Sequence, residues 1–233
     1  MADGTTRISR PQRWDVPFSE AMSEADVDRL GQVPLLADID ESRFPASIPF
    51  RGVLLNDTRL RKFERGDIIV REGDYGSSAF LILNGGVQVV LDSLPARMLG
   101  RRPPQKKGFL RSLAQLWTQP AYPEVRHYSK GVAATGLADG ALQARGKADK
   151  DVRVFLQDVS SVLDENHTAR LEEGEIFGEI AAMSRAPRSA TVIAEGPVEL
   201  LELRWQGLRE IRKYAPAWKE HIDRLYRERS LGR

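Results

Sequence analysis

The sequence predicts a mainly β protein with flanking helices, arranged as an antiparallel sandwich or barrel. From Thr58 the chain divides into short runs rich in β-branched and aromatic residues, separated by glycine-containing turns. Short strands at near-regular spacing are typical of such folds. The pattern stops at Asp92 and resumes near Ala169, so the β structure is split into two halves. The strands expected most clearly are Leu60–Phe63, Ile68–Val70, Phe80–Leu83, Val87–Leu91 and Val198–Leu203.

Helical patterns precede the first β half. Residues 1–24 are expected to form an N-terminal arm, and a first helix begins around Ser23 and ends before Gly31. A second helix start is indicated by Asp38 with Glu41 three residues later, as in a capping box. Residues 25–91 are therefore interpreted as N-terminal helices followed by the first half of the barrel.

Two further helices follow the second β half, which spans residues 169–204. The first is expected over Gln206–Lys213 and the second after Pro216, a residue favoured at the first helical position. The second helix carries an apolar stripe made of Trp218, Ile222, Leu225 and Tyr226. Residues 205–233 are therefore interpreted as the C-terminal helices.

Residues 92–168 are predicted to be an insertion that is partly helical and basic. The segment is too long for a structureless loop within a compact domain. Phe109, Leu110, Leu113, Leu116 and Trp117 share one helical face, and Val152–Val162 is expected to add a strand or a helix. Between Arg97 and Lys130 eight basic residues accompany the single acid Glu124. For Lys106–Trp117, docking on the protein's own barrel is favoured over contact with a membrane or nucleic acid.

Composition excludes several kinds of chemistry. The chain has no cysteine, which removes disulfides, thiolate metal sites and cysteine nucleophiles. Its three histidines are far apart in sequence, so neither a metal site nor a metal-dependent enzyme on a related barrel is expected. A hydrophobic fraction of 41% and a charged fraction of 29% are typical of a globular protein. No secretory signal is visible, and a cytoplasmic location is predicted.

The segment Phe177–Val192 carries the residues best suited to bind a ligand. Gly178 allows close backbone approach, and a helix starting at Glu179 would present the N–H groups of Ile180 and Ala181 to a phosphate. Arg188 offers a planar fork of donors to the same phosphate. Glu179 could accept hydrogen bonds from sugar hydroxyls.

These residues lie in a longer pattern that resembles the cyclic-nucleotide-binding domain family, which includes the catabolite activator protein and protein kinase A regulatory subunits. The resemblance covers Gly66–Gly73, Phe80–Gly85 and Phe177–Val192, which looks like the family's phosphate-binding cassette. The step of nine residues from Glu179 to Arg188 matches the cassette in spacing. The resemblance implies an eight-stranded jelly-roll barrel, with the insertion between its fourth and fifth strands.

The resemblance also implies roles for single residues. Arg188 would bind the exocyclic phosphate, Glu179 the ribose 2′-hydroxyl, and Ser189 would add a hydroxyl to the phosphate. The nucleotide-binding residues predicted in this way are Gly178, Glu179, Ile180, Ala181, Arg188, Ser189 and Ala190. Trp218 and Tyr226 are interpreted first as packing residues of the last helix, and second as a lid over the base.

The function implied is that of a non-enzymatic sensor that binds a cyclic mononucleotide and signals through its C-terminal helices. Cyclic AMP is favoured over cyclic GMP, and no tightly bound cofactor is expected. The last helix is a candidate for homodimer contact, and no DNA-binding domain follows it in this chain. The alternative hypothesis is a nucleotide-free barrel that acts as a protein-interaction or scaffold module through the basic insertion.

Overall fold

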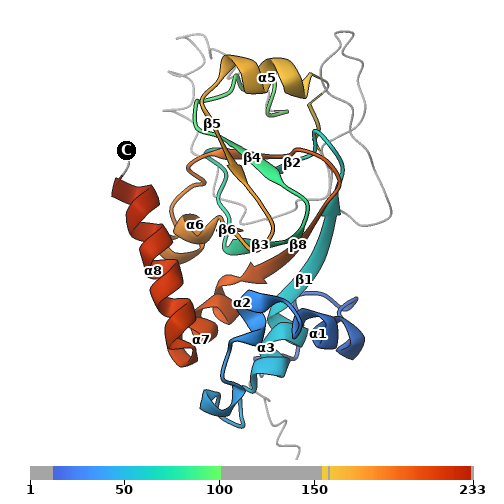
Figure 1. Cartoon of the computed structure of the whole chain (residues 1–233), viewed down its shortest axis with the longest axis vertical. Helices are drawn as coiled ribbons and strands as arrows, with labels where there is room; N and C mark the ends of the chain where they lie inside the picture. The colour runs from blue at the N-terminus through green and yellow to red at the C-terminus, as the bar shows by residue number, and fades with distance from the viewer. Residues whose placement is uncertain (1–12, 101–153, 157, 232–233) are drawn as a thin grey trace, which may run out of the picture. The chain divides into compact units, whose positions relative to one another are not determined.

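The computed structural model describes residues 13–100, 154–156 and 158–231. The chain divides into two compact units, residues 1–93 with 158–233, and residues 94–157. The candidate site and the helices and strands below belong to the first unit (Figure 1). Its strands are β1 (Thr58–Phe63), β2 (Ile68–Val70), β3 (Ser78–Asn84), β4 (Val87–Val90), β5 (Thr168–Leu171), β6 (Ile176–Phe177), β7 (Thr191–Ala194) and β8 (Val198–Arg204). Its helices are α1 (Glu24–Leu30), α2 (Pro34–Ala37), the 3-10 helix η1 (Glu41–Arg43), α3 (Phe50–Asp57), α5 (Val159–Glu165), α6 (Glu179–Ser184), α7 (Trp205–Tyr214) and α8 (Pro216–Leu231).

The strands form two four-stranded antiparallel sheets, with orders β1-β8-β3-β6 and β2-β7-β4-β5. Each sheet joins strands from before and after residues 92–168, so the two β halves of the sequence build one structure. The mainly β class and the five strands expected most clearly are confirmed. The described residues place α5 between β4 and β5. Closure of the sheets into a jelly-roll barrel stays a prediction.

The N-terminal helices follow the sequence signals, with one correction. Helix α1 is capped by Ser23, which exchanges hydrogen bonds with Asp26, and Gly31 follows its last residue. The prediction that Asp38 caps a helix is wrong. Asp38 lies at the C-terminal end of α2, and it is the side chain of Asp40 that accepts from the amide of Ser42 at the start of η1. The capping residue lies two positions later because Pro34 starts a short helix in which Asp38 is the C-cap residue.

Helices α1, α2, α3, α7 and α8 pack at one end of the sheets and build most of the larger hydrophobic core. Leu54 of α3, Leu201 of β8, Leu208 of α7 and Ile222 of α8 are buried together there. A second core cluster lies within the sheets and contains Phe80 and Phe177. Figure 1 shows α8 starting next to α7 and running past α6. The last helix, α8, therefore packs against the short helix α6.

The two C-terminal helices are confirmed, with Pro216 as the first residue of α8. In Val152–Val162, which the sequence left open between strand and helix, residues from Val159 onward are helical. The expected helix around Phe109–Trp117 lies outside the described residues. In the described part of the chain, no helix is long and apolar enough to cross a membrane.

Candidate functional site

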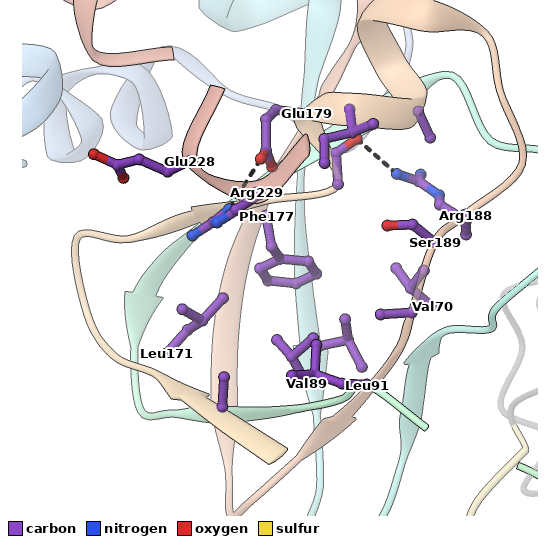
Figure 2. Close-up of a pocket in the computed structure, with 16 residues that line it drawn as sticks. Val70, Val89, Leu91, Leu171, Phe177, Glu179, Arg188, Ser189, Glu228 and Arg229 are labelled. Atoms are coloured by element: carbon purple, nitrogen blue, oxygen red, sulfur yellow. Dashed lines mark hydrogen bonds and ion pairs between the residues drawn. The ribbon is translucent and has the colours of Figure 1, made fainter. Parts of the chain in front are cut away.

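A cavity of about 260 Å³ opens beside α6 and is the candidate functional site (Figure 2). One end is apolar and is lined by strand residues such as Val89, Leu171 and Phe177. The other end is polar and holds Glu179 and Arg188. A ligand that fits both ends must combine an apolar part with an anionic, hydroxyl-bearing part.

Local backbone geometry sets the polar end. Gly178 has φ +76° and precedes the first residue of α6, so the chain turns sharply out of β6 into the helix. That turn directs the side chain of Glu179 inward, where it is 1% exposed. Beneath the turn, the rings of Phe80 and Phe177 stack with centroids 5.0 Å apart. The position of Glu179 is thus fixed by a turn that requires glycine and by a packed aromatic pair.

Arg188 is held from two directions. Its amide donates to the carbonyl of Asp74 at 2.8 Å, and its carbonyl accepts from the amide of Gly73 at 2.7 Å. Its side chain folds back so that Nη1 donates to the carbonyl of Gly178 at 2.9 Å, and Cζ lies 5.6 Å from the centroid of the Phe80 ring. The guanidinium therefore points at the backbone of the turn before α6 and not at bulk water.

In the part of the chain that the structure describes, the charge of Arg188 has no counter-ion within salt-bridge distance. The residue is 7% exposed, and within the described residues no carboxylate forms a salt bridge with it. Burial lowers the pKa of Arg188, while the more distant carboxylates of Glu202, Glu179 and Asp74 act in the opposite direction. A guanidinium remains charged under these conditions. Burying a cation without an ion pair costs free energy unless an anion binds beside it.

Glu179 differs from Arg188 because it has a partner. Its Oε1 lies 3.0 Å from Nη1 of Arg229, and the same nitrogen donates to the carbonyl of Ile176 at 2.6 Å. Arg229 comes from the last turns of α8, so this ion pair joins the C-terminal helix to α6 (Figure 2). The carboxylate at the polar end is therefore coupled to the position of α8.

The structure brings together the residues predicted to bind the ligand. Those that line the cavity are Gly178, Glu179, Ile180, Ala181, Arg188, Ser189 and Ala190. Trp218 does not line it. Its side chain is 2% exposed within the helical core, and its Nε1 donates to the carbonyl of Leu35 at 2.5 Å. Tyr226 is half-buried and lies outside the lining as well.

Sequence reasoning missed Glu228 and Arg229, which line the cavity from α8. Both lie in the polar C-terminal part of the helix, one turn beyond the apolar stripe, and there they read as surface charges. Their spacing from Ile222 and Leu225 could have indicated that this part of α8 continues past the core toward α6.

The fold and the site together define a β module with a pocket that is apolar at one end and carries Glu179 and Arg188 at the other. The model of the cyclic nucleotide-binding domain family matches residues 152–214. This match contains α6, Glu179 and Arg188, and it confirms the resemblance found in the sequence.

Several solved structures are similar to the chain. A cAMP-binding acyltransferase from Mycobacterium smegmatis is 19% identical, with a TM-score of 0.48, and the match covers 90% of this chain and 42% of that one. The regulatory domain of Toxoplasma gondii PKA with cAMP is 16% identical, with a TM-score of 0.44 and coverages of 88% and 49%. A putative cyclic nucleotide-binding protein from Geobacter metallireducens is 12% identical, with a TM-score of 0.42 and coverages of 88% and 96%.

The chain spans less than half the length of the first two of these proteins. All three TM-scores lie below 0.5, so these similarities assign neither a ligand nor an activity to this chain. The ligand has to be argued from the cavity itself.

Proposed function

We propose that this chain is a sensor that binds a cyclic mononucleotide and is not itself an enzyme. The observation that carries the proposal is Arg188, a nearly buried cation without a salt bridge among the described residues, at the polar end of a cavity with an apolar far end. A phosphate diester supplies the missing negative charge, and a purine supplies an apolar face for the other end. The match of residues 152–214 to the cyclic nucleotide-binding domain family supports the same ligand class.

In the proposed complex, the exocyclic phosphate lies against Arg188 and Ser189, and the ribose 2′-hydroxyl donates to Glu179. The base then extends toward Val89, Leu171 and Phe177, which provide no hydrogen-bonding side-chain groups. A guanine would leave more of its polar groups without partners there than an adenine, and each unpaired buried polar group costs about 1–3 kcal/mol. This asymmetry favours cyclic AMP over cyclic GMP.

The proposed output is a movement of α8. The ion pair between Glu179 and Arg229 joins α8 to the carboxylate that would receive the ribose, so ligand contact and helix position share one group. The ligand shifts α8 only if it binds the two helix positions with different affinity. Cytoplasmic location and a homodimer through α8 remain predictions.

The direct test is a calorimetric titration of the chain with cyclic AMP. Replacing Arg188→Ala removes the only cation that lies at the proposed phosphate position in the described structure, and we expect a loss of about 2–5 kcal/mol in binding free energy. Arg185→Ala is the matched control, because Arg185 is exposed, lies in the same segment and does not line the cavity. Its affinity should stay close to that of the wild type.

Equal affinity of wild type and Arg188→Ala for cyclic AMP would remove the basis of the proposal. If millimolar cyclic AMP, cyclic GMP and cyclic dinucleotides all fail to raise the melting temperature of the wild type, the scaffold hypothesis takes its place. Its basic insertion contains residues 101–153, which lie outside the described residues.

A further inference from the structure

The space around the Arg188 guanidinium is bounded by two glycines from different parts of the chain. Gly178 precedes α6, and Gly76 lies in the loop between β2 and β3. A Cβ atom on Gly178 would lie 2.5 Å from Nη1 of Arg188. A Cβ atom on Gly76 would lie 2.6 Å from both Nε and Nη2. The guanidinium thus fits between two positions at which any side chain would collide with it.

The backbone conformation at position 76 does not require a glycine. Gly76 is not among the glycines with positive φ, so an alanine can adopt its conformation without strain. It is also not among the residues that line the cavity. The space that its missing side chain leaves is taken up by Arg188, whose backbone pairs with residues 73 and 74 of the same loop.

The side from which a Cβ atom on Gly76 would approach the Arg188 guanidinium matters for anion binding. A Cβ atom on Gly76 would be closer to Nε and Nη2 than to Cζ, which it would approach to 2.9 Å. The collision therefore falls on the edge of the guanidinium that carries these two nitrogens. That edge is one of those through which a guanidinium binds an anion with two parallel hydrogen bonds.

We infer that Gly76 is a positioning residue for phosphate recognition: it leaves the space in which the Arg188 guanidinium is held ready for the anion. This inference rests on the proposed function. A substitution at Gly76 acts on affinity through Arg188, and it acts on the phosphate part of the ligand and not on the nucleoside part.

The geometry also indicates that Gly76→Ala still folds. The three nearest atoms to the added methyl group all belong to the end of the Arg188 side chain, and none is a backbone atom. Such a side chain can move at lower cost than the backbone of a sheet. Its movement is limited on the other side by Gly178 and the ring of Phe80, so it has to leave the position that faces the phosphate.

The first experiment compares cyclic AMP with adenosine, which lacks the phosphate, by calorimetry. We expect Gly76→Ala to reduce the ratio of the two affinities at least tenfold, while the affinity for adenosine changes less than twofold. Gly196→Ala is the matched control, since a Cβ atom there meets nothing within 4 Å. An unchanged ratio in a folded Gly76→Ala variant that binds cyclic AMP would overturn the inference.

The second experiment distinguishes an effect of Gly76→Ala that acts through Arg188 from a general effect on folding. In an Arg188→Ala background, Gly76→Ala should have almost no further effect on affinity, because the group that it displaces is absent. In an Arg188→Lys background its effect should be smaller than in the wild type, since an ammonium lacks the Nε–Nη2 edge. Additive losses in these double variants would contradict the inference.

The melting temperatures of the same variants give a test that needs no ligand. Any destabilisation by Gly76→Ala should be relieved when Arg188→Ala is added, because the collision then has no partner. A wild type that fails to bind cyclic AMP would refute the proposed function and with it the role in phosphate recognition, whereas the thermal coupling tests the contact between Gly76 and Arg188 by itself. If Gly76→Ala is equally destabilising with and without the arginine, Gly76 has another structural role.

Discussion

Two buried charge clusters in this protein are built in opposite ways. Asp57, which is fully buried, receives Arg13 at 2.5 Å and Arg204 at 2.7 Å, and the neighbouring carboxylate of Glu210 takes Arg13 at 3.0 Å and Arg209 at 2.9 Å. There each buried carboxylate has cations within hydrogen-bond distance.

At the cavity the buried charges are paired differently. Among the described residues, Glu179 forms an ion pair with Arg229, whereas the guanidinium of Arg188 contacts a carbonyl and the ring of Phe80 but no carboxylate. Breaking a buried ion pair destabilises the fold, whereas a buried charge without a pair at a cavity is a candidate for ligand binding. We therefore assign the first cluster to structure and propose the second as a binding site.

The largest effect expected from this comparison is on stability at Asp57. Replacing Asp57→Ala leaves Arg13 and Arg204 without their shared carboxylate, and removing one partner from a buried ion pair costs about 3–5 kcal/mol. Urea denaturation measures the loss. Glu24→Ala is the control, because Glu24 forms an exposed ion pair with Arg51 and such pairs contribute little. Equal losses in the two variants would mean that pairing at Asp57 does not stabilise the fold.

A smaller effect on stability is expected at Arg229, which forms an ion pair with Glu179 at the cavity. Arg229→Gln leaves the buried carboxylate of Glu179 without a cation, and an unsatisfied buried group costs about 1–3 kcal/mol. Hydrogen exchange in residues 225–231 should become faster, and cyclic AMP affinity should fall less than tenfold. Arg227→Gln changes an exposed cation of the same helix and should leave the exchange unaltered. Unchanged hydrogen exchange in Arg229→Gln would show that this ion pair does not couple α8 to the site.

The smallest effect expected is a pH dependence due to His221 of α8. Burial is the main cause that lowers the pKa of His221, and the nearby cations Arg224 and Arg229 lower it further, against Glu228 and Glu179. Since the pKa is lower in the folded than in the unfolded chain, stability is full above about pH 6.5 and decreases as the pH falls. His221 is partly exposed, so the change in melting temperature should be small.

His221→Gln should make the melting temperature less dependent on pH between 7.5 and 5.5. The Nε2 atom of His221 is buried without a partner in the described structure, which agrees with a neutral ring. An identical pH dependence of variant and wild type would assign it to another group.

Much of the fold could be predicted because its signals are local. Ser23 caps α1, glycines divide the strands, and Pro216 starts α8, and each of these acts within a few residues. The prediction at Asp38 was wrong for the same reason. Two acidic residues lie two positions apart, and only the three-dimensional chain path decides which of them caps a helix.

The site was predicted where its residues are close in sequence, and missed where they are not. Glu179 and Arg188 lie within one cassette, so their spacing indicated a shared pocket. Arg229 is 50 residues from Glu179, and the importance of Gly76 depends on a side chain 112 positions later. Neither contact leaves a local pattern in the sequence.

The measurement that tests the central claim most directly is the free energy of unfolding of wild type and Arg188→Ala, each with and without cyclic AMP. Without ligand, Arg188→Ala should be at least as stable as the wild type, because it removes a nearly buried charge that has no ion pair among the described residues. At one hundred times the dissociation constant, cyclic AMP should stabilise the wild type by about 2.7 kcal/mol and the variant far less. A variant that is less stable without ligand, together with a wild type that cyclic AMP does not stabilise, would show that Arg188 serves the fold and not a ligand.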